Sequence, residues 1–137
     1  MNRHVVHSCT LVALLLTGCA LPLQERDMNA MASSLTKVSA AVDATVRYKR
    51  SADSLEGDAL LQAATAHDPQ MLKPLEGRTV KVLRAQRDSA VLVCDAPNAL
   101  PLLEDAGCTA RLDVHRWRQN LNDRCEFSLD LPQTCSR

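Results

Sequence analysis

The sequence contains no isoleucine and only three aromatic residues, Tyr48, Trp117 and Phe127. Leu, Val and Ala must therefore build the hydrophobic core, with little help from large aromatic side chains. Glycine occurs only four times, and the chain has neither a glycine-rich phosphate-binding loop nor a G-x-S-x-G nucleophile turn. These absences argue against the enzyme classes that use those motifs.

The chain also lacks an excess of charge of either sign, with 16 Lys and Arg against 16 Asp and Glu. Without a basic stripe to follow phosphates, we expect no nucleic-acid partner. His67 and His115 lie at an expected helix end and on a polar strand face, and we interpret both as solvated, like Glu104-Asp105 and Asp113. We therefore expect no enzyme activity, no cofactor and no small-molecule substrate.

What the chain does have is a short apolar run, 11–15, between Arg3 and Leu16-Thr17-Gly18-Cys19. The run is too short to span a bilayer, and its charged start and small residues are typical of a secretory signal peptide, 1–18. Leu16-Thr17-Gly18-Cys19 resembles the lipobox of bacterial lipoproteins. In that family the signal is cut before the cysteine, which receives acyl chains on sulfur and nitrogen. The alternative is a soluble secreted protein.

The resemblance implies a lipid anchor at Cys19, because two or more acyl chains hold a protein stably on a membrane. The next residues are Ala20-Leu21-Pro22, without the Asp that retains enteric lipoproteins at the inner membrane. The family pattern therefore implies the outer membrane, facing the periplasm. We expect 19–27 to be a lipidated tether and 28–137 to be one small domain.

Four cysteines remain in the mature domain: Cys94, Cys108, Cys125 and Cys135. In an oxidising periplasm, an even number of cysteines in a small domain indicates two disulfides. Zinc is the competing interpretation, but the chain has no C-x-x-C pair and its histidines lack ligand spacing, so no metal site is predicted.

An apolar stripe at steps of three and four residues predicts an amphipathic helix from about 28 to 50. The stripe has two interpretations: the helix packs on its own domain's sheet, or it offers a heptad seam to a partner chain. In the second case its residues are candidates for partner binding. The candidates are Met28, Met31, Leu35, Val38 and Val42.

The rest of the chain predicts a second helix over 55–66 and a hairpin of strands 79–83 and 90–94 with one well-buried strand. A short helix over 99–106 closed by Gly107, a strand over 109–117 and a last strand over 126–131 follow. We therefore expect an α+β fold: N-terminal amphipathic helices on one face of a mainly antiparallel four-stranded sheet, with a short crossover helix.

This arrangement favours one of the three possible disulfide pairings. If the last two strands form a hairpin, Cys108 and Cys135 meet at its open end, and a right-handed crossover brings Cys94 to Cys125 at the turn end. The predicted pairs are Cys94–Cys125 and Cys108–Cys135.

A second resemblance covers about 78–135. Cys94-x-x-Pro97, Leu102-Leu103, Gly107 and a cysteine near the C-terminus are similar to the α/β type of pilotin lipoprotein of type II secretion systems. It implies a Cys94–Cys135 disulfide and a groove between helix and sheet that binds a peptide helix of the secretin. The chain departs from the pattern by running from its buried strand straight into Cys94 and by adding Cys108 and Cys125.

Three functions follow as hypotheses. The first is an outer-membrane lipoprotein that binds, localises or assembles an envelope or secretion component. The second is a periplasmic inhibitor of a hydrolase, whose contact would be the loop 116–120 with Trp117, since exposed Trp and Arg often anchor interfaces. Trp117 is otherwise a core residue. The third is a structural lipoprotein that assembles through its N-terminal helix.

Overall fold

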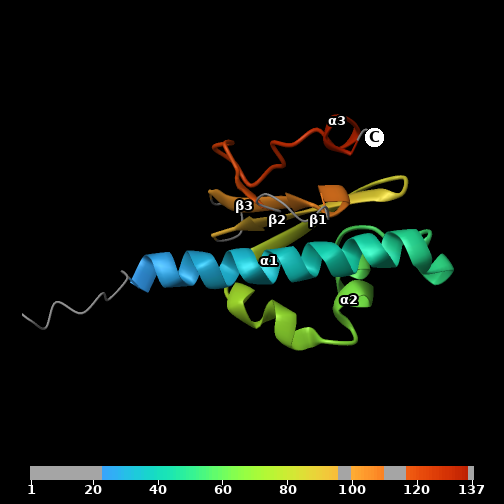
Figure 1. The fold of residues 1–137 in the computed structure, drawn as a ribbon, viewed down its shortest axis with the longest axis horizontal. Coiled ribbons are helices and arrows are strands. Elements are labelled where there is room, and N and C mark those ends of the chain that lie inside the picture. Colours follow the sequence, from blue (N-terminus) through green and yellow to red (C-terminus); the bar gives the residue numbers. More distant parts are fainter. Residues whose placement is uncertain (1–22, 96–99, 110–116, 136–137) are drawn as a thin grey trace, which may run out of the picture.

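The protein is a layered α+β domain in the computed structural model, which describes residues 23–95, 100–109 and 117–135. Figure 1 shows helices on one side of a small sheet and the C-terminal segment on the other. The α+β class and the helix-on-sheet packing are confirmed. The signal peptide, Cys19, His115 and most of the expected strand 109–117 lie outside the described residues.

Helix α1, Leu23–Tyr48, is 26 residues long and crosses the whole domain. Its apolar stripe packs on the sheet, which is why Leu35, Val38 and Val42 have no exposed surface. The helix starts earlier than the sequence predicts, so 23–27 is helical, and the expected nine-residue tether of 19–27 is wrong in that part. A 3-10 turn, Arg50–Ala52, then leads to helix α2, Gly57–Thr65, at the position predicted, and to a 3-10 helix, Pro69–Leu75.

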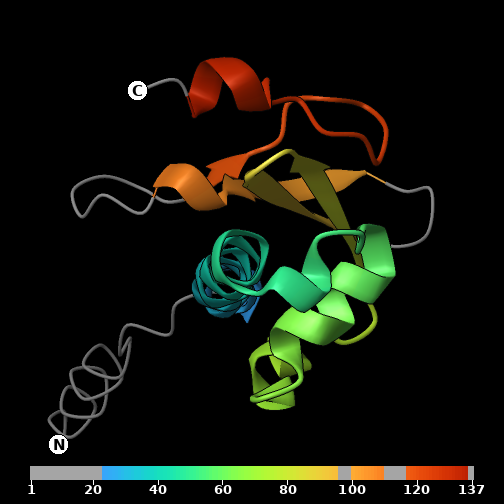
Figure 2. The ribbon, with the colours of Figure 1, turned by 90° about the vertical axis from the view of Figure 1, so that its right-hand side faces the viewer.

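Four antiparallel strands form the sheet in the order β1-β2-β3-β4. Strands β1, Thr79–Ala85, and β2, Asp88–Cys94, form the predicted hairpin, and Gln86 in its turn has a φ of 56°. Strand β3, Pro101–Ala106, pairs with β2, and the short β4, Arg118–Gln119, pairs with β3. β2 is buried at six of its seven residues because α1 covers one face of the sheet and the C-terminal segment covers the other (Figure 2).

The expected short helix over 99–106 is wrong, because 101–106 is the third strand. Leu, Glu and Ala favour a helix locally, but pairing with β2 buries this segment on both sides, and such tertiary gains outweigh propensity. The crossover helix and the parallel arrangement inferred from it are therefore absent from this connection.

Gly107 does not close a helix but allows close packing. A Cβ atom at this position would overlap the Cβ of Asp43, so α1 and the end of β3 approach each other where only glycine fits.

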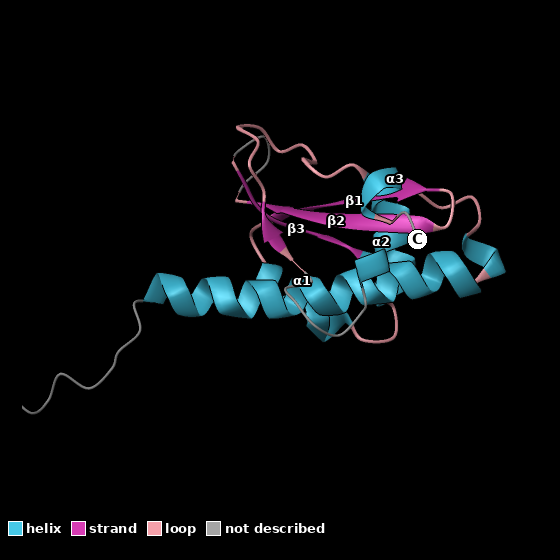
Figure 3. Cartoon of the chain, turned by 45° about the horizontal axis from the view of Figure 1, so that its top comes forward, coloured by secondary structure: helices cyan, strands magenta, loops and turns pink. Residues whose placement is uncertain are grey.

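The expected last strand over 126–131 is also wrong. Residues 120–130 cross the outer face of the sheet without regular structure and end in helix α3, Leu131–Thr134 (Figure 3). Asp130 caps this helix by accepting a hydrogen bond from the Gln133 amide, and Pro132 occupies its first turn, where the missing N–H costs nothing.

Candidate functional site

The residues proposed to contact a partner through the N-terminal helix are buried in the chain's own core. Met31, Leu35, Val38 and Val42 are 0–2 % exposed, and Met28 is half-buried against them. The interpretation of this stripe as a seam for another chain is therefore wrong for this fold.

The loop proposed to contact a hydrolase is also built into the domain in its described part. Trp117 is half-buried and packs against the main core, and Arg118 and Gln119 form β4. Asn120 is only 5 % exposed, and its backbone N–H donates to the carbonyl of Leu102 at 3.3 Å. Residues 117–120 are thus the edge of the sheet rather than a projecting loop.

Two disulfides join the C-terminal segment to the two ends of the sheet. Cys94, the last residue of β2, is bonded to Cys125, with a Cα–Cα distance of 5.8 Å. Cys108, just beyond β3, is bonded to Cys135, with a Cα–Cα distance of 5.5 Å. These are the pairs predicted from strand geometry, and the Cys94–Cys135 pair implied by the pilotin resemblance is wrong.

The pairing arises from a different geometry from the one expected. Because β2 and β3 are antiparallel, Cys94 and Cys108 lie at opposite ends of the sheet. The segment 120–135 runs from one end to the other, so each end meets one of its cysteines (Figure 1). The two bonds therefore fix both ends of the covering layer.

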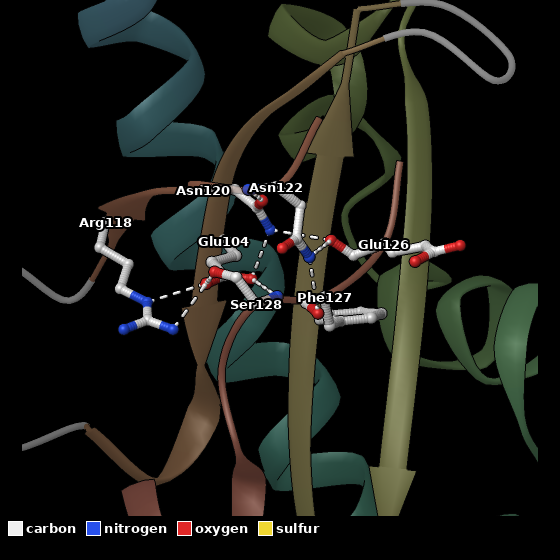
Figure 4. Close-up of polar contacts among 7 residues, drawn as sticks. All are labelled: Glu104, Arg118, Asn120, Asn122, Glu126, Phe127 and Ser128. Atoms are coloured by element: carbon white, nitrogen blue, oxygen red, sulfur yellow. Dashed lines mark hydrogen bonds and ion pairs between the residues drawn. The ribbon is translucent and has the colours of Figure 1, made fainter. Parts of the chain in front are cut away.

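Between the disulfides, a buried carboxylate holds the same layer. Glu104 lies in the middle of β3 with no exposed surface. Arg118 Nε donates to its Oε1 at 2.8 Å, and Asn120 Nδ2 and the Ser128 amide donate to its Oε2 at 2.7 and 2.9 Å (Figure 4). The Ser128 hydroxyl donates to Oε1 as well.

The surrounding asparagines extend this network along the C-terminal segment. Asn120 Nδ2 and Asn122 Nδ2 each donate to the carbonyl of Glu126 at 3.0 Å, and Asn122 also donates to that of Phe127. The Asn122 amide in turn donates to Asn120 Oδ1 at 2.8 Å. An irregular segment thereby satisfies its backbone groups through side chains, as burial requires (Figure 4).

Both oxygens of Glu104 accept hydrogen bonds from groups that follow β3 in the chain, so this carboxylate is suited to holding the structure together. A helix over 99–106 places Glu104-Asp105 at a solvated helix end, so this expectation does not reveal the buried role of Glu104. The sequence carries one signal for its burial. Glu104 directly follows the apolar pair Leu102-Leu103 and lies close to Gly107 and Cys108, in a region rich in cysteine.

The end of α1 farthest from residue 23 carries a charged cluster. Arg47 Nε donates to Asp43 at 2.9 Å, and its Nη2 donates to Asp88 at 2.7 Å. The hydrogen bond with Asp43, helped by the charges of Asp43 and Asp88, raises the pKa of Arg47 above its ordinary value. Tyr48, which follows Arg47 in the chain, is 80 % exposed, and His67 lies on the surface with its Nε2 3.4 Å from Lys49 Nζ.

Two shallow pockets open beside α1. One, of about 250 Å³, lies against the 3-10 helix near Ser34 and Met71, and the other, of about 200 Å³, lies near Met28, Arg78 and Leu102. Both are smaller than the cavities of about 300–1,000 Å³ that hold small ligands. Across the described ranges, no group of three or more His, Cys, Asp or Glu side chains is arranged to bind a metal ion.

The comparisons with known proteins give no family: the chain matches no family model, no curated protein and no solved structure. No helix within 23–95, 100–109 or 117–135 has the length and apolar character needed to cross a membrane.

Proposed function

We propose that this protein is a non-catalytic lipoprotein of the outer membrane that binds an envelope or secretion component and helps to localise or assemble it. The observation that carries the proposal is the position of α1. The helix begins four residues after the lipobox cysteine, Cys19, and then forms the centre of the main core. Acyl chains on Cys19 would thus be connected to the rigid part of the domain by three residues.

The construction of the rest of the domain supports a binding role. Two disulfides and the Glu104 network hold the outer layer without a regular element longer than four residues. A surface fixed in this way loses little conformational freedom when it binds, which favours affinity. The disulfide pairing implied by the pilotin resemblance differs from the pairs observed, so we carry no partner-contact residue over from that family.

Among the described residues, the most exposed aromatic side chain is Tyr48, at the end of α1 away from the anchor. Tyr is enriched among the residues that dominate interface energies. The helix-assembly hypothesis depends on residues that are buried in the chain's own core, and the described part of the inhibitor loop, 117–120, is the edge of the sheet, so the binding function at the anchor is the one we propose.

Two measurements test the proposal. Mass spectrometry of the protein from envelope fractions should find acyl chains on Cys19, and Cys19→Ala should release the protein from the outer membrane. A photo-crosslinking residue in place of Tyr48 should then give an adduct with a secretin or another assembly component, whereas the same residue at exposed Lys37, on the side of α1, serves as the control. An unacylated Cys19 in the envelope protein would refute the anchor, and Tyr48 adducts identical to those of Lys37 would refute a specific partner at this end.

A further inference from the structure

The start of α1 lies at the same end of the domain as the end of β2 and the start of β3. Arg47 near the end of α1 bonds to Asp88 at the start of β2, and Arg78 near the start of β1 lies 3.7 Å from Asp27. Helix α1 is therefore antiparallel to β2. Its first turns, the end of β2 and the start of β3 lie at the same end, as Figure 1 shows on its left side.

Two strongly exposed leucines lie at this end. Leu100 is 62 % exposed just before β3, and Leu121 is 87 % exposed just after Asn120. They flank the backbone hydrogen bond from Asn120 to Leu102, so both belong to the same edge of the sheet. The exposed Tyr48 lies at the other end of α1.

The anchor proposed above restricts how far this end can move from the bilayer. Three residues separate Cys19 from the first residue of α1, Leu23. Leu23 lies four residue steps from Cys19, and a fully extended chain spans at most about 3.6 Å per step, so the tether reaches only about 14 Å. The inference below rests on the proposed lipid anchor.

We propose that the end of the domain bearing Leu100 and Leu121 rests on the membrane surface, with both leucines among the lipid headgroups and upper acyl chains. Because the first turns of α1 extend past the sheet (Figure 1), the helix then stands oblique to the membrane and Tyr48 points into the periplasm. An exposed leucine gains by leaving water, which explains why two are placed where a bilayer surface is within reach.

The charges around the leucines indicate which lipids this contact needs. Asp95 is ion-paired with Arg78, and Asp123 and Arg124 are both exposed beside Leu121. Because both signs are present, the contact depends on the apolar side chains rather than on anionic lipid. It should therefore form on zwitterionic vesicles.

The test uses the mature acylated protein, which begins at Cys19, in phosphatidylcholine vesicles whose acyl chains are brominated near the headgroup. Leu121→Trp and Leu100→Trp place a fluorophore at the proposed contact, and Tyr48→Trp is the matched control at the opposite end. All three positions are exposed, so the fold should tolerate the change. The wild-type protein gives the background from Trp117, which is subtracted.

We expect the emission of Leu121→Trp and Leu100→Trp to shift to the blue and to be quenched by the brominated lipid, and that of Tyr48→Trp to do neither. If the protein floats with the vesicles but the first two variants are quenched no more than Tyr48→Trp, the membrane contact is refuted while the anchor stands. If the protein does not float, or its mass lacks acyl chains, the proposed lipoprotein itself is refuted.

Discussion

Glu104 shows how a charged residue can hold an irregular segment in place. Burying a carboxylate costs several kcal/mol unless hydrogen bonds replace its water. Here the replacement comes from Arg118 in the edge strand β4 and from Asn120 and Ser128 in the segment that forms the outer layer. The free-energy cost of burying Glu104 is offset only when the segment follows its observed course. Glu104 therefore favours that course over other arrangements of the segment.

The first prediction concerns this carboxylate. Glu104→Ala should destabilise the domain by about 3 kcal/mol, because it leaves buried donors of Asn120 and Ser128 without acceptors. Glu104→Gln should cost less, since it keeps the shape and one acceptor oxygen. Urea unfolding followed by circular dichroism measures both.

The matched control is Glu126→Gln. The side chain of Glu126 is exposed, and the network uses only its backbone carbonyl, so the change should stay within about 0.5 kcal/mol of wild type. Equal effects of Glu104→Gln and Glu126→Gln would contradict the structural role of Glu104.

At the scale of elements, the apolar stripe of α1 forms the core contact with the sheet. Leu35→Ala should therefore cost about 2–5 kcal/mol, as expected for a buried leucine truncated to alanine. Lys37→Ala, on the exposed side of the same helix, should change stability by less than about 0.5 kcal/mol. A Leu35→Ala variant that kept its stability but changed its sedimentation would instead identify the stripe as an interface between chains.

The disulfides give the third prediction. Replacing Cys94 and Cys125 together by alanine should cost about 2–4 kcal/mol and more than replacing Cys108 and Cys135, because the first pair is 0 % and 4 % exposed and the second only partly buried. In the second variant, hydrogen exchange should rise in α3 while 120–128 stays protected by the Glu104 network. Equal exchange along the whole segment would contradict that division.

The elements differ in how far the sequence predicts them, for a physical reason. The stripe of α1 and the alternation of β1 and β2 are local periodic patterns, and both elements were predicted. Strand β3 was not, because Leu102, Leu103 and Glu104 favour a helix locally and become a strand only by pairing with β2. The course of 120–130 depends on side chains such as Asn120 and Asn122 that donate hydrogen bonds to backbone carbonyls further along the segment. Such contacts produce no periodic pattern in the sequence.

The contrast between local patterns and distant contacts also explains why the disulfides were predicted and the buried carboxylate of Glu104 was not. The even number of cysteines and the oxidising compartment expected for the protein predicted two disulfides, and the observed pairs are the predicted ones. The predicted pairing assumed a parallel crossover, whereas the strands are antiparallel throughout the sheet. Glu104 could not be recognised, since its burial depends on the misassigned strand. A correct pairing therefore did not require a correct path of the chain.

For the whole molecule, α1 joins the proposed anchor to the opposite end. A helix of 26 residues is about 39 Å long at 1.5 Å per residue, so Tyr48 lies about that far along the axis from the point where the tether begins. The two ends differ in chemistry: exposed leucines lie near the start of α1, and Tyr48 with the Arg47 ion pairs lies at its end. One end is thus suited to lipid and the other to protein.

The last prediction tests whether this orientation depends on the short tether. Inserting ten Gly and Ser residues between Pro22 and Leu23 adds a flexible chain with an end-to-end distance of about 17 Å. The insertion lowers the effective concentration, at the bilayer, of the end of the domain that bears Leu100 and Leu121. In brominated vesicles, Leu121→Trp with the insertion should remain bound, because acylation at Cys19 is unchanged, but its quenching should fall toward that of Tyr48→Trp. A ten-residue insertion into the exposed β1–β2 turn after Gln86, at the other end of the sheet, is the control and should leave the quenching unaltered. Undiminished quenching with the tether insertion would mean that the leucines bind lipid without help from the tether, and that the length of 20–22 does not set the orientation of the domain.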